Sequence, residues 1–231
     1  MPQTVPMKII ARIRSDFSAK FGIPRQSGLV ETLTAEIVFE PEYRNPDAFR
    51  GLEGYSHIWL LWQFSEAQRD DWSPTVRPPR LGGNTRMGVF ATRSPFRPNA
   101  IGLSCVKLVG IDLHTPDGPI LRVAGADLMD DSPIYDVKPY LPYVDAHPEA
   151  TGGFSLATHE DLIEVHFPEE LLELLPADRR QAAIDVLAQD PRPGYQSEPG
   201  RRYGMEFAGF DVKFTVENDV LTVCDVVKLK G

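Results

Sequence analysis

Arginine residues are concentrated in one segment of an otherwise acidic chain. The 231 residues carry a formal net charge of -9, yet the forty residues from Trp72 to Ile111 contain no aspartate or glutamate. Their cations give a local charge of +6, which leaves -15 on the rest of the chain. Arginine binds phosphate and carboxylate through paired hydrogen bonds, and glycine lets the backbone approach a ligand. The pattern predicts an anion site, with a solvated surface loop as the alternative; the cations are Arg77, Arg80, Arg86, Arg93, Arg97 and Lys107.

Residues that bind metals or form disulfides lack the spacing that such sites need. Cys105 and Cys224 lie far apart inside apolar stretches and form no CxxC pattern, and the five histidines form no HExxH pattern. The N-terminus has no long apolar core of a signal peptide, and no segment approaches the roughly 20 apolar residues of a membrane span. We therefore expect a cytoplasmic protein with no metal and no membrane partner.

Short strands are expected to position the arginine-rich segment. Runs rich in β-branched or aromatic residues at 7–13, 33–39, 57–64, 87–92, 103–113 and 120–126 are separated by Pro, Gly and Asp turns. The only helical pattern among them, at 46–53, is too short to connect parallel strands. The sequence therefore predicts a mainly β barrel or sandwich over residues 1–146.

The composition changes after residue 146. Residues 147–161 contain few large apolar side chains and many turn formers, which is typical of a linker. Beyond them the pattern predicts a strand at 162–167, helices at 168–175 and 177–189, and two strands on either side of a turn at 217–219. We expect residues 162–231 to form a small α+β C-terminal domain.

Several motifs resemble those of one known family. GVFATRSPFRPNAIGLS at 88–104, with RPPRLGGN before it and GADLMDDSPIYDVKPYLPYVD after it, resembles the signature of the TsaA-like family, the tRNA N6-adenosine methyltransferases called TrmO. The resemblance extends to IARIRSDFSAKFGIPRQSGLV, GLEGYSHIW, QDPRPGY and FDVKFTV, so it covers most of the chain in order. It implies a TsaA-like β-barrel, a C-terminal domain that binds tRNA, S-adenosyl-L-methionine as cofactor, and a homodimer.

The resemblance also implies the reaction. The methyl group would go to N6 of threonylcarbamoylated adenosine at position 37, beside the anticodon. A Gly-rich turn in a βαβ context, which doubly wound methyltransferases use, does not occur in the chain, so the cofactor site would be of a non-Rossmann type. A sensor that binds the cofactor without catalysis and an RNA-binding protein without chemistry are the alternatives.

Cofactor contacts implied by the resemblance come from separated loops. Apolar side chains would enclose the adenine and the methionine chain, Arg93 would bind the cofactor carboxylate, and Asp130 would lie near the sulfonium or the ribose. Taken alone, Phe17 and Leu103 are typical of core residues, and His57 is as typical of a structural histidine as of a ligand. Arg93 either fixes a turn or binds an anion, and the second alternative is favoured. The implied cofactor residues are Ser15, Asp16, Phe17, Ser56, His57, Arg93, Leu103, Leu128, Met129, Asp130 and Asp131.

The acceptor nitrogen places a demand on the site. In the threonylcarbamoyl nucleoside N6 belongs to a urea, and its lone pair is a poor nucleophile until a base removes the proton. Asp130 is the first candidate for this catalytic base and His57 the second. The threonyl carboxylate also needs a cation, for which Arg86 or Arg97 is suited. Asp136, Lys138 and Tyr140 in the motif YDVKPY either form a structural ion pair and a hydroxyl contact or line the site.

Binding of tRNA is expected at a focused basic surface, because a chain with a pI near 5.1 does not attract nucleic acid as a whole. An aromatic side chain, Tyr195 or Tyr203, is a candidate to stack on an unpaired base of the anticodon loop. The predicted phosphate contacts are Arg77, Arg80, Arg86 and Arg97 in the first domain, with Arg192, Arg201 and Arg202 in the second.

Two positions depart from the family pattern. The usual sequence Asp-Gly-Thr-Pro is replaced by Asp130, Asp131, Ser132 and Pro133. Aspartate at 131 is tolerable if the backbone is left-handed, and it adds a charge to the loop. Asp16 stands where a proline is common. Both changes fall in loops that the resemblance assigns to the cofactor.

Overall fold

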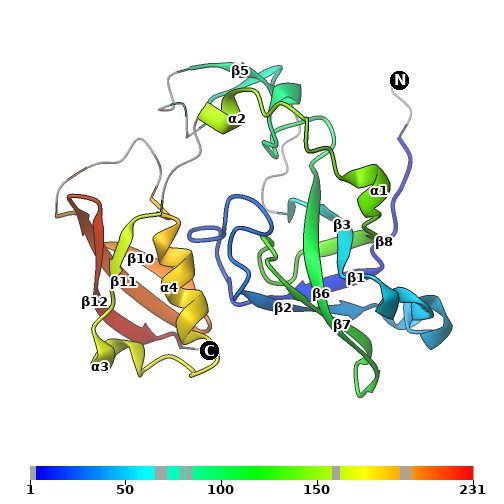
Figure 1. Cartoon of the computed structure of the whole chain (residues 1–231). Coiled ribbons are helices and arrows are strands. Elements are labelled where there is room, and N and C mark those ends of the chain that lie inside the picture. Colours follow the sequence, from blue (N-terminus) through cyan, green and yellow to red (C-terminus); the bar gives the residue numbers. More distant parts are fainter. Residues whose placement is uncertain are drawn as a thin grey trace.

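A closed barrel of six strands forms the larger part of the molecule. The computed structural model describes residues 4–65, 72–78, 81, 85–157, 162–192, 198 and 200–230. Neighbouring barrel strands run antiparallel in the order β1, β2, β7, β6, β3, β8 (Figure 1). The prediction of a mainly β fold with a barrel is confirmed. The strands are β1 (Ala11–Arg14), β2 (Thr34–Phe39), β3 (His57–Gln63), β6 (Ile101–Thr115), β7 (Gly118–Ala124) and β8 (Pro133–Pro139).

Alternating side chains build the barrel core. In β3 the side chains of Ile58, Leu60 and Trp62 are buried, and the residues between them are partly exposed. This alternation is expected of a strand with one face toward a core. Strand β8 closes the barrel by pairing with both β1 and β3, although the sequence pattern does not predict it. Its sequence PIYDVKP begins with proline and contains charged residues, which are poor strand formers.

Short helical turns connect the barrel strands. The helical pattern at 46–53 corresponds to two 3-10 turns, η2 (Pro46–Phe49) and η3 (Leu52–Gly54), which follow η1 (Pro41–Tyr43). The run at 87–92 is shorter as a strand than predicted, because β5 (Met87–Gly88) pairs with β4 (Thr75–Val76) and then gives way to η6 (Val89–Ala91). Helices α1 (Pro142–Asp145) and α2 (Phe154–Ala157) follow the barrel.

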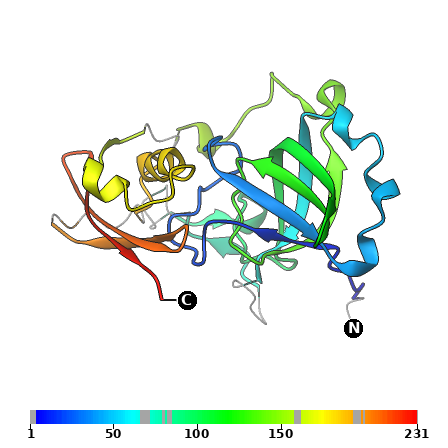
Figure 2. The same ribbon diagram turned by 90° about the horizontal axis from the view of Figure 1, so that it is seen from below.

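The C-terminal part contains a four-stranded sheet with two helices on one face (Figure 2). The strand order is β10, β11, β12, β9, and β9 is parallel to β12 while the other pairs are antiparallel. The elements are β9 (Glu164–His166), α3 (Glu169–Leu172), α4 (Arg180–Ala188), β10 (Tyr203–Phe207), β11 (Phe210–Glu217) and β12 (Val220–Lys228).

A turn at Ala208 and Gly209 separates β10 from β11. The expectation of only two strands after residue 204 is wrong, because this turn produces a third strand. Both turn residues have positive φ angles, 51° and 80°, as a tight hairpin turn requires. Alanine rarely adopts this conformation, so the sequence gives a weak turn signal here.

The connection between β1 and β2 joins the two parts of the molecule. Phe17, Val30 and Leu33 lie in the same buried cluster as Met205 and Phe207 of the C-terminal sheet. The ring of Phe17 packs edge-on against Phe207, with the ring centroids 5.4 Å apart. The barrel core is a separate cluster. The first connecting loop therefore contributes to the C-terminal core.

Within the described part of the chain, no helix is long and apolar enough to cross a membrane. The same residues contain no group of three or more His, Cys, Asp or Glu side chains arranged to bind a metal ion. Cys105 and Cys224 are free thiols.

Candidate functional site

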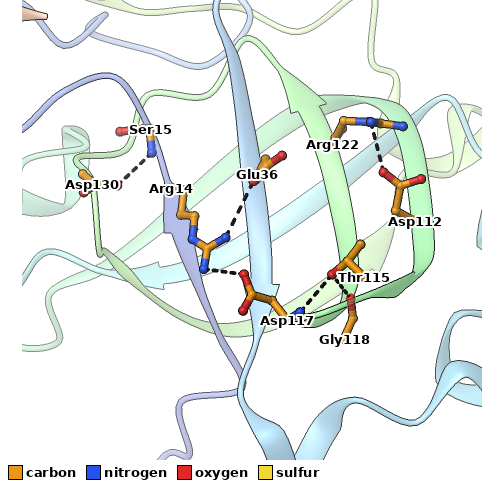
Figure 3. A network of polar contacts seen from close by, with 9 residues as sticks. All are labelled: Arg14, Ser15, Glu36, Asp112, Thr115, Asp117, Gly118, Arg122 and Asp130. Carbon is orange, nitrogen blue, oxygen red and sulfur yellow. Dashed lines mark hydrogen bonds and ion pairs between the residues drawn. The ribbon is translucent and has the colours of Figure 1, made fainter. Parts of the chain in front are cut away.

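The loop after β1 and the loop before β8 are bound to each other. The backbone N–H of Ser15 donates to Oδ1 of Asp130 at 2.9 Å (Figure 3). The Ser15 hydroxyl donates to the carbonyl of Leu128 at 3.0 Å. In return, the N–H of Asp130 donates to the carbonyl of Phe17 at 2.8 Å. Residues 15–17 and 128–130, which are more than a hundred positions apart in sequence, therefore form one rigid cluster.

Ion pairs fix the end of β1 directly before this cluster. Arg14 contacts Asp117, in the turn between β6 and β7, with 2.8 Å between Nη2 and Oδ2 (Figure 3). It also lies 3.9 Å from Glu36 on β2. These contacts tie three neighbouring strands together at the point where the Ser15 loop begins.

Asp131 has the left-handed backbone that the sequence requires, with a φ of 60°. Its N–H donates to the carbonyl of Ile13 at 2.9 Å. Nη1 of Arg12 lies 3.1 Å from both the carbonyl oxygen and Oδ2 of Asp131. The charge that this position adds to the loop is thus paired with an arginine of β1.

A pocket of about 470 Å³ opens beside the cluster, between the barrel and the C-terminal part. Asp16 and Arg179 meet in its wall, with 2.9 Å between Oδ2 and Nε. Burial raises the pKa of Asp16, and the guanidinium of Arg179 opposes this effect in part. The pocket is lined by Ser15, Asp16, Ser18, Asp130, Pro176, Asp178, Arg179, Ala208, Gly209 and Leu229.

The side chains of Phe17 and Leu128 do not line any exposed surface. Phe17 is 0% and Leu128 1% exposed. The expectation that they form apolar walls of a cofactor site is therefore wrong, and these residues contribute backbone carbonyls that accept hydrogen bonds within the loop cluster. Leu103 is 51% exposed, so its side chain is not a core residue and is available to a ligand. Met129 is partly exposed.

A buried hydrogen-bond chain connects β3, β6 and the loop before β8. Nε1 of Trp62 donates to the hydroxyl of Ser104 at 2.9 Å, and that hydroxyl donates to Oδ1 of Asp127 at 2.5 Å. Burial raises the pKa of Asp127, while the Ser104 hydroxyl and the charge of Arg93 lower it in part. Asp127 thus precedes Leu128 in the loop and contacts Ser104, which follows Leu103 in β6.

The sequence reasoning missed Asp127, whose carboxyl accepts the hydrogen bond that ends this chain. The signal was an acid between apolar residues in GADLM, since a carboxylate in such a setting is either paired or functional. Arg93 approaches the same region from another loop, where its Nη1 donates to Oε1 of Gln26. The hydroxyl of Ser27 accepts from the N–H of Cys105 at 3.1 Å.

Ser56 and His57 lie at the other end of β3. His57 is the first residue of this strand, whereas Trp62, near its last residue, pairs with Gly102 and Ile134. Six residues of strand span roughly 20 Å. Within a single chain, His57 therefore does not contact the cluster of Ser15 and Asp130. The Ser56 hydroxyl lies 2.9 Å from Nδ1 of His57.

The residues of the motif YDVKPY also differ in their surroundings. Lys138 and Asp136 form an ion pair of 2.8 Å on β8, which agrees with the structural alternative for these two residues. The ring of Tyr140 lies 6.2 Å from that of His57 and 5.8 Å from that of Trp59. Tyr140 therefore belongs to the end of the barrel where His57 lies.

The predicted tRNA-binding arginines differ in their surroundings. Arg77 is exposed, and Nη1 of Arg86 donates to the hydroxyl of Thr75 at 3.2 Å. Nη2 of Arg97 lies 3.5 Å from the carbonyl of Val89. Arg80 is outside the described residues.

In the C-terminal part, Arg192 is 17% exposed and makes two hydrogen bonds to Asp190, of 2.8 and 2.7 Å. Arg201 pairs with Glu198 at 3.4 Å, and Arg202 is exposed. Tyr203 is 8% exposed in the C-terminal core, so the expectation that its ring stacks on an RNA base is wrong. Tyr195 lies outside the described residues.

Comparisons with known proteins cover nearly the whole chain. Residues 12–146 match the tRNA-methyltransferase O N-terminal domain, and residues 160–229 match the TrmO C-terminal domain. The chain is 43% identical to an Escherichia coli K12 protein named tRNA (adenine(37)-N6)-methyltransferase, over 90% of this chain and 91% of that protein. It is 41% identical to a Pseudomonas aeruginosa protein named putative S-adenosylmethionine-dependent methyltransferase RcsF, over 94% of this chain and 95% of that protein. A crystal structure of TrmO from P. aeruginosa covers 99% of both chains with a TM-score of 0.78 and 35% identity.

Proposed function

The chain belongs to the tRNA-methyltransferase O family, and we propose that it transfers a methyl group from S-adenosylmethionine to N6 of adenosine 37 in tRNA. The observation that carries this proposal is the match to both domains of the family, in order and along 12–146 and 160–229. The E. coli relative bears the name of this activity. We further propose a cytoplasmic enzyme with domains at 1–146 and 162–231 and a linker at 147–161.

The residues around the pocket suit this cofactor. The pocket is lined by three carboxylates, of Asp16, Asp130 and Asp178, and by one guanidinium, of Arg179. This negative balance favours a ligand that carries a sulfonium and an ammonium group. Arg93 and Leu103 are not among the residues that line the pocket; where the cofactor extends beyond it, Arg93 would bind the carboxylate of the methionine part and Leu103 would offer apolar surface. When bound, the cofactor supplies the electrophilic methyl group.

The finer substrate is adenosine 37 that already carries a threonylcarbamoyl group. Methyl transfer is an in-line displacement, for which alignment of the reactants supplies much of the rate. The urea N6 also has to lose a proton, and Asp130 is the proposed base, because its exposed carboxylate lines the pocket and is held in place by the N–H of Ser15. His57 is the second candidate. Arg86 or Arg97 would pair with the threonyl carboxylate.

We propose a homodimer because the implied cofactor residues are divided. Ser15 and Asp130 lie in one cluster, whereas Ser56 and His57 begin a strand whose far end is near that cluster. In a symmetric dimer, the His57 end of one copy can face the Ser15 end of the other. Light scattering combined with size-exclusion chromatography gives the mass of the assembly, and a monomer that methylates at full rate would exclude this arrangement.

Single-turnover methylation tests the function. Purified protein is mixed with S-adenosylmethionine labelled in its methyl group and with tRNA that carries or lacks the threonylcarbamoyl group. The nucleosides are then separated and identified by mass spectrometry. We expect label only on N6 of the modified adenosine. Cofactor binding with no transfer to either tRNA would instead support the sensor alternative.

A further inference from the structure

Trp72 and Phe90 form an aromatic pair on the surface. Their ring centroids are 6.0 Å apart and the ring planes make an angle of 25°. Trp72 is 50% exposed and Phe90 is 73% exposed. Contact of large aromatic faces with water is unfavourable, so two stacked rings with this exposure are typical of a binding surface.

A small β-ladder supports the pair. Thr75 of β4 pairs with Gly88 of β5, and the N–H of Val89 donates to the carbonyl of Pro74 at 3.0 Å. Trp72 precedes the first strand of this ladder and Phe90 follows the second. The two rings therefore occupy the same end of the ladder, and their spacing is set by backbone hydrogen bonds.

Arginines are attached to the same ladder. Arg86 donates from Nη1 to the hydroxyl of Thr75 at 3.2 Å, and Nη2 of Arg97 lies 3.5 Å from the carbonyl of Val89. Arg77 is exposed directly after β4. Since the sequence from Trp72 to Ile111 contains no acid, nothing within this segment neutralises these cations. Exposed aromatic rings beside arginines are the combination that binds single-stranded nucleic acid.

We propose that Trp72 and Phe90 form a platform on which an unpaired base of an RNA loop stacks, while Arg86 and Arg97 contact the adjacent phosphates. This inference rests on the proposed function and deepens it, because it names the RNA feature that the enzyme recognises. A protein partner fits less well, since a stable interface buries about 800 Å² on each side. Trp72 and Phe90 are the exposed aromatic side chains described at this end of the ladder, and the side chain of Arg86 reaches Thr75 from the other end.

Binding of two RNA probes by the full-length protein tests the platform. One probe is a short RNA hairpin with an unpaired loop, and the other is a fully paired duplex of the same stem. Trp72→Ala and Phe90→Ala are each expected to weaken hairpin binding by about 5- to 150-fold, the range for loss of one base stack, and to leave duplex binding nearly unchanged. Arg86→Ala should weaken both probes and reduce the dependence of affinity on salt. Phe90→Tyr should retain hairpin binding.

Fluorescence and a control variant make the test specific. The chain has three tryptophans, and the hairpin should quench the emission of Trp72, a change that is absent in Trp72→Phe. Tyr143→Ala removes an aromatic ring that is 83% exposed on α1 and should change nothing. Equal weakening of hairpin and duplex by Phe90→Ala would overturn the platform. So would loss of cofactor binding, or of self-association, with hairpin binding intact.

The result that would contradict the proposed function differs from the result that would contradict the platform. If the hairpin is preferred over the duplex and this preference depends on Trp72 and Phe90, the platform stands even where no methyl group is transferred. Methyl transfer that is insensitive to both alanine variants, with hairpin affinity unchanged, would contradict the platform and leave the proposed function intact.

Discussion

Arg179 of the C-terminal part binds Asp16 in the loop after β1, with 2.9 Å between Nε and Oδ2 and 3.1 Å between Nε and Oδ1. The carbonyl of Asp16 also accepts the N–H of Ala208 at 2.8 Å, so the C-terminal part contacts this residue twice. Ser15, which precedes Asp16, is bound to Asp130. Contacts therefore run without a gap from the C-terminal part to the proposed cofactor loops. This chain has an aspartate where proline is common in the family, and Arg179 is the cation that pairs with it.

Arg179→Ala is expected to lower both the free energy of unfolding and the affinity for S-adenosylmethionine. The side chain of Asp16 is 14% exposed, and without Arg179 its charge would be buried unpaired. Loss of a charge-assisted hydrogen bond costs about 1.5 to 3 kcal/mol, measured by urea unfolding and by calorimetry. Arg180→Ala is the matched control, because Arg180 donates only to the carbonyls of Leu175 and Glu173 within its own domain. Equal loss of cofactor affinity in both variants would refute a specific role of Arg179.

The pH dependence of the same variant has a definite sign. Burial raises the pKa of Asp16, so its contribution to stability is present at low pH and declines as the pH rises through the folded-state pKa. Arg179 opposes that shift, and its removal should raise the pKa further. The stability difference between parent and Arg179→Ala is therefore expected to shrink as the pH falls from about 7 to about 4. Asp16→Asn combined with Arg179→Ala should abolish this pH dependence.

Asp127 should respond to pH in the same sense. Burial raises its pKa, so the folded state loses stability as the pH rises and the carboxyl ionises. Ser104→Ala removes a hydrogen bond that lowers this pKa, and the loss of stability with rising pH should become steeper. Asp127→Asn removes the ionising group, and its unfolding free energy should vary less between about pH 4 and 7 than that of the parent. Unfolding curves at several pH values measure all three proteins; an unchanged pH dependence in Asp127→Asn would exclude this group.

Asp130→Asn is expected to preserve cofactor binding and to slow single-turnover methylation by about 10² to 10⁴, the usual contribution of a positioned base. The amide oxygen can still accept the N–H of Ser15, so the loop should keep its shape. His57→Ala tests the second candidate in the same assay. If Asp130→Asn methylates at the parent rate, Asp130 is at most a cofactor ligand. Transfer to tRNA without the threonylcarbamoyl group should be much weaker in every variant.

The sequence predicted what depends on local pattern, and it failed where distant residues decide. Alternation in the apolar run at 57–64 correctly indicated a half-buried strand of the barrel. Strand β8 begins with proline and contains Asp136 and Lys138, which weaken its strand pattern, and β1 and β3 pair with its two edges. The burial of Tyr203 depends on packing against Phe21 and Phe214, which no local pattern in the basic C-terminal segment reveals.

The candidate site shows the same division. Sequence reasoning named a left-handed backbone as the condition for aspartate at position 131, and the φ of 60° meets that condition. The pairing of Asp16 with Arg179 joins residues 163 positions apart, and that of Ser104 with Asp127 joins β6 to the loop between β7 and β8. Each of these acids gave only a local signal in the sequence, and its partner became visible only when the chain was folded.

Arg93→Ala is expected to weaken S-adenosylmethionine binding by about 1.5 to 3 kcal/mol, because the guanidinium would lose a charge-assisted contact with the cofactor carboxylate. Gln26→Ala should weaken binding less, since Gln26 acts on the cofactor through Arg93, from which it accepts a hydrogen bond. Arg93→Lys keeps the charge without the planar fork and should fall between the two. Calorimetry with the cofactor and, separately, with a cofactor analogue that lacks the carboxylate measures these effects. If Arg93→Ala loses as much affinity for the analogue as for the cofactor, Arg93 acts on the loop that contains Gln26 and not on the carboxylate.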